Sequence, residues 1–265
     1  MKEWLDHYIK QGVTKFLLID NGSSDNYLHI INPYIKANKV HLVVDSTKHK
    51  QVELYNIHYL DKCKKYEWVL VCDLDEFIYA RKGFSSIKKY LESVAGNITQ
   101  ICIPWKIFGS CGYDTADKKQ PESVIESFTT RINYDKDSNF QGVKKEDNDK
   151  YSLTKSIVRT KFIQKIHIHS HMTLKSVNIC SDSISNIHRE DTCFAKINET
   201  ILNDAFLHLN HYAIQSYDWF MKVKASRGDV SGIYSECIRD ENYFRTYDSC
   251  SNDLVDDELA RLKVT

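Results

Sequence analysis

The segment WVLVCDLDEF, residues 68–77, ends an apolar run with three acidic side chains. Asp73, Asp75 and Glu76 follow one another so closely that mutual repulsion makes each carboxylate costlier to ionise. A cation bound between them would remove that cost. If the strand stays regular, Asp73 and Asp75 point to the same face. Two hard oxygen ligands on one face suit Mg²⁺ or Mn²⁺, so the sequence predicts a divalent metal site.

Around this segment, the spacing of apolar residues alternates between the strand period and the helix period. Strand patterns cover residues 15–20, 40–45, 68–77 and 98–108, and helix patterns cover residues 3–12, 23–36, 51–65 and 85–94. This alternation is typical of an α/β, Rossmann-like fold with a mostly parallel central sheet flanked by helices. Later patterns predict loops over 114–124 and 133–150, a strand pair over 154–159 and 165–171, and a strand followed by a helix over 205–228.

Three of the predicted strands end on aspartate, at Asp20, Asp45 and Asp73. In open α/β sheets the ligand binds beyond the carboxyl ends of the strands, where these side chains would gather. Asp20 or Asn21, in the turn DNGSSDN of residues 20–26, could hydrogen-bond a nucleobase or ribose. An aspartate at a strand end can also simply start a turn, and we keep that interpretation for Asp45.

The overall composition excludes some partners. Lys and Arg number 36 and Asp and Glu number 36, so the formal net charge of zero does not favour nucleic acid or an anionic membrane. The eight cysteines are dispersed, which favours reduced thiols. No apolar run is long enough to span a bilayer, so we expect no transmembrane segment in this chain. The sequence slightly favours the cytoplasm over the Golgi lumen.

Five segments, in this order, resemble glycosyltransferases of family 92 and related GT-A enzymes of the family 2 type. They are EWLDHYIKQGVTKFLLIDNGSSDN, WVLVCDLDEF, IPWKIFGSCG, KSIVR and LNHYAIQSYDWFMKVKASRGD. The resemblance implies a GT-A fold, a nucleotide-sugar donor linked to UDP, and a divalent ion such as Mn²⁺. It also implies transfer with inversion to a glycan or another hydroxyl acceptor. We expect one domain over residues 1–265, with a nucleotide and metal half at 1–113 and an acceptor half at 114–265.

The resemblance also assigns residues to the donor side. Asp73 and Asp75 match the metal and nucleotide-sugar motif, and Asp20 with Asn21 matches the nucleotide-binding strand end. A late histidine often completes the metal shell in GT-A enzymes, and the matching candidate is His211, although a histidine beside aromatic residues is often structural. Three basic residues follow at a spacing that could reach the diphosphate or form a solvated helix face: Lys222, Lys224 and Arg227.

On the acceptor side, Trp105 and Phe108 could stack on a sugar, and core packing explains both aromatic residues almost as well. An inverting transfer also needs a general base near the acceptor hydroxyl. The sequence does not choose between four acidic candidates, of which the first two lead: Asp114, Glu126, Glu190 and Asp191.

Two further groups of residues keep two interpretations each. His167, His169 and His171 fall on one side of an ideal strand, where they could bind zinc or line a groove, and the groove is favoured. Lys155 and Arg159, in KSIVR, could contact an anion or carry surface charge.

Members of this family normally begin with an apolar strand that ends in an Asn-Glu pair, before the helix that contains E-W-L. Here the sequence starts almost at that helix, so we expect the usual first strand to be missing or replaced. The sequence is then either a fragment or a reduced form whose donor pocket is incomplete. The alternative function is therefore an inactive GT-A scaffold that binds glycans or assembles with other proteins. A third class, the aspartyl-phosphate phosphatases, also carries D-x-D after a buried strand, but its motif usually continues with Thr or Val rather than Glu76 and Phe77.

Overall fold

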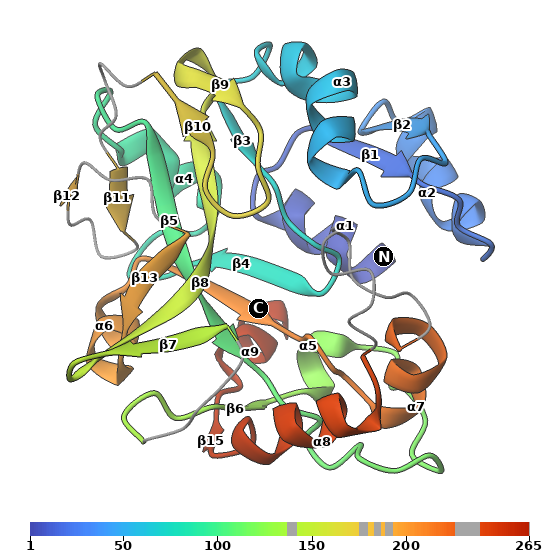
Figure 1. Cartoon of the computed structure of the whole chain (residues 1–265). Helices are drawn as coiled ribbons and strands as arrows, with labels where there is room; N and C mark the ends of the chain where they lie inside the picture. Colours follow the sequence, from blue (N-terminus) through green and yellow to red (C-terminus); the bar gives the residue numbers. More distant parts are fainter. Residues whose placement is uncertain (137–141, 175–179, 183–186, 189–192, 226–238, 265) are drawn as a thin grey trace.

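The computed structural model describes residues 1–136, 142–174, 180–182, 187–188, 193–225 and 239–264 (Figure 1). Its α-helices are α1 Lys2–Lys10, α2 Tyr27–Lys36, α3 Gln51–Cys63, α4 Ile87–Ser93, α5 Val124–Ser127, α6 Glu199–Asp204, α7 Tyr217–Trp219, α8 Glu241–Cys250 and α9 Glu258–Val264. A π-helical turn, Phe220–Lys224, continues α7. The four helices predicted in the first half are therefore confirmed, with shorter bounds for each.

The strands are β1 Phe16–Asp20, β2 Val40–Val44, β3 Trp68–Leu70, β4 Glu76–Ala80, β5 Gln100–Ile107, β6 Thr130–Arg131, β7 Val143–Glu146, β8 Asp149–Arg159, β9 Ile163–Lys165, β10 Met172–Thr173, β11 Cys180–Asp182, β12 Ile187–His188, β13 Phe194–Ile197, β14 Leu207–His211 and β15 Leu254–Val255. The strand predicted over 205–228 is β14, and a helix follows it as predicted.

The main sheet is mixed, so the prediction of a mostly parallel sheet was wrong. Strand β5 pairs in parallel with β14 and β11 and antiparallel with β8. Strand β8 is also antiparallel to β3, β7 and β13, and β14 is antiparallel to β4. The alternation of apolar residues shows that a segment is a strand but not which neighbour it joins. For this reason the long strand β8 could not be placed between β3 and β5 from the sequence.

The segment that begins at Trp68 forms two short strands rather than one. Strand β3 ends at Leu70 and pairs with β8, and β4 begins at Glu76 and pairs with β14. Between them the chain turns, and the backbone N–H of Glu76 donates to the carbonyl of Asp73 at 3.1 Å. Asp73 and Asp75 therefore lie in a turn and do not alternate along a regular strand.

Two other predictions about strands need correction. Residues 143–150, predicted as part of a loop, include β7 and the start of β8, which pair as a hairpin. Residues 165–171, predicted as a strand, mostly form the connection between β9 and β10. Charged side chains obscured the hairpin, because one face of a hairpin at the surface needs few apolar residues. In residues 165–171, the alternation of isoleucine and histidine has the period of a strand although the segment is a connection.

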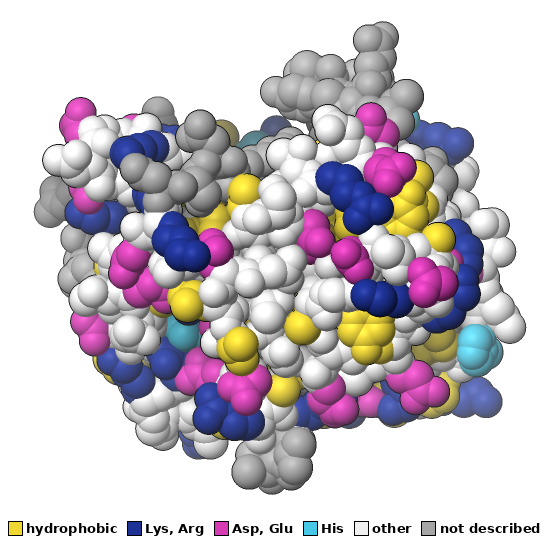
Figure 2. All heavy atoms as spheres, turned by 90° about the horizontal axis from the view of Figure 1, so that it is seen from below, with side chains coloured by type: hydrophobic (Ala, Val, Ile, Leu, Met, Phe, Trp, Pro, Cys, Tyr) yellow, Lys and Arg dark blue, Asp and Glu magenta, His cyan; other side chains and the backbone are white. Residues whose placement is uncertain are grey.

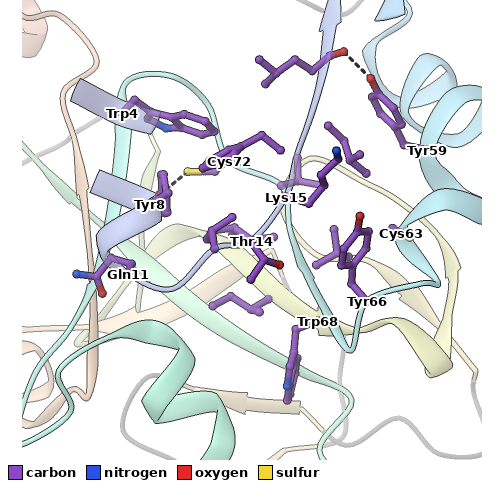
Figure 3. A pocket seen from close by; sticks show the side chains of 18 of the residues that line it. Trp4, Tyr8, Gln11, Thr14, Lys15, Tyr59, Cys63, Tyr66, Trp68 and Cys72 are labelled. Atoms are coloured by element: carbon purple, nitrogen blue, oxygen red, sulfur yellow. Dashed lines mark hydrogen bonds between the residues drawn. The ribbon is translucent and has the colours of Figure 1, made fainter. Parts of the chain in front are cut away.

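Strands β1 and β2 form a separate parallel pair at one side of the molecule (Figure 1). A cavity of about 640 Å³ lies between β1 and β3, lined by residues 13–20 and 66–73 together with α1 and α3. Figure 3 shows Trp4 and Tyr8 of α1 on one side of this cavity and Tyr59 and Cys63 of α3 on the other. The cavity explains why most apolar side chains of β1 and β3 are only half-buried.

The C-terminal segment is attached to the sheet by buried ion pairs. Asp256, just after β15, accepts from Lys106 Nζ at 2.9 Å and from Arg131 Nε at 2.6 Å. Arg131 also pairs with Glu199 at 2.7 Å. Only 1% of the Lys106 side chain is exposed, and burial lowers the pKa of Lys106 to about 8 although Asp256 favours its charge. The charge of Lys106 therefore depends on Asp256.

The surface agrees with the balanced composition. On the face shown in Figure 2, acidic and basic side chains are interspersed, and hydrophobic side chains are scattered among them. In the described part of the chain, no helix has both the length and the apolar content needed to cross a membrane.

We expect Asp256→Asn to lower the free energy of unfolding by about 3 to 5 kcal/mol, because it leaves two buried cations without their shared carboxylate. Urea unfolding followed by circular dichroism measures the change. The matched control is Asp253→Asn in the same segment, since Asp253 forms its ion pair with the exposed Lys136. A similar, small change in both variants would contradict the assignment of the buried network as the main attachment.

Candidate functional site

The carboxylates of the turn between β3 and β4 receive a cation from the chain itself. Lys155 lies in the middle of β8, opposite Ile103 of β5, and its side chain has no exposed surface. Its Nζ donates to Asp73 Oδ2 at 2.8 Å and lies 3.4 Å from Glu76 Oε2. Sequence reasoning left Lys155 open between anion contact and surface charge. The side chain contacts two carboxylates and is buried.

The protonation of this buried group follows from its surroundings. Burial opposes the charge of Lys155, but Asp73 and Glu76 outweigh burial and raise the pKa of Lys155. Burial raises the pKa of Glu76 to about 8, although Lys155 favours the ionised form. Glu76 Oε2 accepts from the backbone N–H of Asp73 at 2.9 Å, and Oε1 has no hydrogen-bond partner among the described residues. Lys155 is therefore the internal cation of this group, and burial favours the protonated form of Glu76.

The third carboxylate of the turn, Asp75, faces a different pair of residues. Lys224 Nζ donates to Asp75 Oδ2 at 2.5 Å, and His211 Nε2 lies 3.9 Å from Asp75 Oδ1. Burial disfavours the charge of Asp75, but the ammonium of Lys224 outweighs it, and the pKa of Asp75 is lowered to about 2. Asp75 is therefore ionised at neutral pH.

His211, at the end of β14, is in the form that binds metals. Burial lowers the pKa of His211 to about 3, so its imidazole is neutral and one ring nitrogen carries a lone pair. Its Nδ1 has no hydrogen-bond partner within the described ranges. The ring packs against Trp105, with 4.1 Å between ring centroids, and the ring of His169 lies 5.6 Å from the same indole.

Asp75 and His211 fit a divalent ion, with limits that the geometry sets. Metal bonds to histidine nitrogen and carboxylate oxygen are about 2.0 to 2.2 Å long, so one ion can reach two atoms 3.9 Å apart. Asp73 has one carboxylate oxygen engaged by Lys155. Within the described residues, no three His, Cys, Asp or Glu side chains form a complete metal-binding group. A metal here would therefore need further ligands from substrate or water.

Two of the three strand-end aspartates line the same cavity. Asp20, Asn21 and Asp73 line the same cavity, whereas Asp45 does not and instead bonds to His58 at 2.7 Å. Asp20 also shapes its own turn, because it accepts from the backbone N–H groups of Gly22 and Ser23 and from the Tyr27 hydroxyl. Because Asp20 lines the cavity, its binding to a nucleobase or ribose stays a prediction.

The basic residues predicted near the diphosphate separate in the structure. Lys224 reaches Asp75, but Lys222 is 65% exposed and pairs with Asp218 at 2.8 Å. Arg227 lies outside the described residues. Of the two aromatic residues predicted on the acceptor side, Phe108 is fully buried in the core, and Trp105 is half-buried beside His211.

The acidic candidates for a general base remain predictions. Asp114 forms a half-exposed pair with Lys118 at 3.1 Å, and Glu126 forms one with Lys263 at 2.8 Å. Glu190 and Asp191 fall outside the described residues.

The three predicted histidines connect the turn after β9 to β8. His169 Nδ1 is 2.8 Å from the carbonyl of Thr154, and His171 Nε2 is 3.2 Å from that of Ser156. The ring of His171 also accepts from the backbone N–H of His167 at 3.2 Å. The bonds to Thr154 and Ser156 hold the connection against the stretch of β8 that carries Lys155.

Comparison with models of protein families identifies the chain as a glycosyltransferase. The matching model describes glycosyltransferase family 92 and covers residues 1–227, so the chain belongs to this family. The protein is thus an enzyme that transfers a sugar from a donor to a glycan acceptor. The matched range contains the carboxylate turn, Lys155, His211 and Lys224. No curated protein matches the chain.

We expect Lys155→Met to lower the free energy of unfolding by about 3 to 5 kcal/mol, because it leaves two carboxylates without their buried cation. Adding Glu76→Gln should recover part of the loss, since it removes one of the stranded acids. Urea unfolding of the single and double variants measures both effects. Lys161→Met, at an exposed position two residues after β8, is the control. Equal stabilities of the two single variants would contradict the internal-cation interpretation.

Proposed function

We propose that the protein transfers a sugar from a UDP-linked donor to a hydroxyl group of a glycan, with inversion, and that a divalent ion bound at Asp75 and His211 assists. The observation that carries this proposal is the approach of ionised Asp75, neutral His211 and Lys224 to one another at the turn. Asp73 of the same turn lines the cavity that Asp20 and Asn21 also line.

The nucleotide-sugar donor would lie between two groups of residues: Asp20 and Asn21 on one side, and Asp75, His211 and Lys224 on the other. Asp20 and Asn21 offer hydrogen-bonding atoms for the base or ribose at the end of β1, and the diphosphate would then lie toward the turn after β3. Mn²⁺ or Mg²⁺ bound by Asp75 and His211, with Asp73 close by, would neutralise the charge that develops on the departing diphosphate. Lys224 supplies a second cation at the same place, because its ammonium already contacts Asp75.

The acceptor side is best supported at Trp105. Its indole contacts both His211 and His169, and it is half-buried, so part of its surface is open to a ligand. An aromatic face beside the metal ligand suits a sugar ring, whose C–H groups pack on aromatic surfaces. For the general base we keep Asp114, Glu126 and Asp191 as candidates, and removing each carboxylate would show which one affects turnover.

Calorimetric titration tests the donor site. We expect UDP to bind more tightly with Mn²⁺ than without it, and more tightly than GDP. Asp75→Asn should weaken the Mn²⁺-dependent binding of UDP by about tenfold or more, because it removes a charged ligand that the metal needs. Asp45→Asn is the matched control, since Asp45 is also a carboxylate in a turn beside a histidine but bonds to His58 and Thr47 instead of approaching His211 and Lys224.

A hydrolysis assay, together with the titration, distinguishes the enzyme from the alternative scaffold function. Hydrolysis of a UDP-sugar, abolished by Asp75→Asn and unaffected by Asp45→Asn, would support the proposal. If neither nucleotide binds in the presence of Mn²⁺ while glycans bind regardless of metal, the proposal fails and a glycan-binding scaffold takes its place.

A further inference from the structure

Strand β4 pairs with β14 along one edge. Along the other edge, side chains on one face of α1 form hydrogen bonds with its backbone N–H and C=O groups. The side chains at positions 4, 7, 8 and 11 share this face, because these spacings return to the same side of a helix. Trp4 Nε1 donates to the carbonyls of Asp73 (3.0 Å) and Glu76 (3.1 Å), and Tyr8 Oη also donates to the carbonyl of Glu76 (3.1 Å). His7 Nε2 donates to the carbonyl of Ile78 (2.7 Å). In the other direction, the backbone N–H of Ile78 donates to Tyr8 Oη (3.0 Å), and that of Ala80 donates to Gln11 Oε1 (3.3 Å).

These bonds replace the neighbouring strand that an open edge would otherwise need. Burial lowers the pKa of His7 to about 4, so its ring is neutral, and the nitrogen facing the carbonyl of Ile78 carries the proton. Trp4 and Tyr8 are almost fully buried, at 7% and 1% exposure. Since each group on this helix face has a fixed partner, the helix and the strand are held in one register.

Two of the carbonyls belong to the carboxylate turn itself. The single indole N–H of Trp4 donates to Asp73 and Glu76, the residues at either end of the turn, and Tyr8 donates to the second of them. Asp75 lies between these two anchored residues. These bonds therefore help to set the position of its carboxylate near His211, together with the bond from the backbone N–H of Tyr212 to the carbonyl of Asp75 at 2.9 Å.

We infer that Trp4 and Tyr8 are positioning residues that set the affinity of the site for its divalent ion without touching the ion. This inference rests on the proposed function, because it concerns the same site. Removal of groups that orient metal ligands typically weakens metal binding by about 10- to 100-fold. We expect a loss at the lower end of that range, because Lys155 and Lys224 still hold Asp73 and Asp75.

The test measures Mn²⁺ binding by electron paramagnetic resonance, which reports the free ion directly. The protein is compared with Tyr8→Phe and with the matched control Tyr79→Phe. Tyr79 is a fully buried residue of β4 whose hydroxyl contacts Glu258 and Lys106 rather than the turn. We expect both variants to lose thermal stability, but only Tyr8→Phe to lose Mn²⁺ affinity, by about tenfold. Trp4→Phe, which frees both ends of the turn, should lose more than Tyr8→Phe.

Each other outcome overturns the inference. Unchanged Mn²⁺ affinity in Tyr8→Phe and Trp4→Phe would refute the positioning role and leave the proposed metal site intact. An equal loss in Tyr79→Phe would show that general destabilisation, not the turn, controls binding. If the unmodified protein does not bind Mn²⁺, both the inference and the proposed metal dependence fall.

Discussion

The buried ammonium of Lys155 is the constraint on which the carboxylate turn depends. Three acidic side chains within one turn repel one another, and two of them lie within 3.4 Å of this single cation. To reach them, Lys155 must lie on a strand that runs between β3 and β5, which is the place of β8. The mixed sheet, the break between β3 and β4 and the position of Lys155 are thus parts of one arrangement.

The acidic residues of the turn have two different surroundings: Asp73 and Glu76 contact Lys155, and Asp75 faces His211 and Lys224. Lys155 and the raised pKa of Glu76 remove the cost of the inner carboxylates, so they need no external ion. Asp75 stays ionised and close to the surface, at 16% exposure of its side chain, beside a histidine that burial keeps neutral. The sequence predicted one cation for all three acids. In the structure, Lys155 serves Asp73 and Glu76, so a metal would bind at Asp75.

The sequence predicted the helices and strands better than it predicted which of them lie side by side. Period and end signals located α1 to α4 and the strands β1, β2, β5 and β14, and the resemblance led to His211, which does lie near Asp75. The turn at Asp73 was missed because WVLVCDLDEF has the composition of one long strand. Lys155 carried a usable signal: a lysine on the same face as Ile157 and Arg159 in a strand that otherwise alternates. Only its partners, distant in the chain, show that it is buried. The bonds of Trp4 to the backbone of the turn leave no trace in side-chain patterning.

Strand β4 shows how far the site depends on the rest of the chain. One edge is held by α1 and the other by β14. Tyr79 in β4 and Arg81 just after it both contact Glu258 in the C-terminal segment. That segment lies beyond residue 227, where the family match ends. Contacts outside the matched range therefore secure the end of β4 that is remote from the turn, whereas α1 secures the end that begins at Glu76.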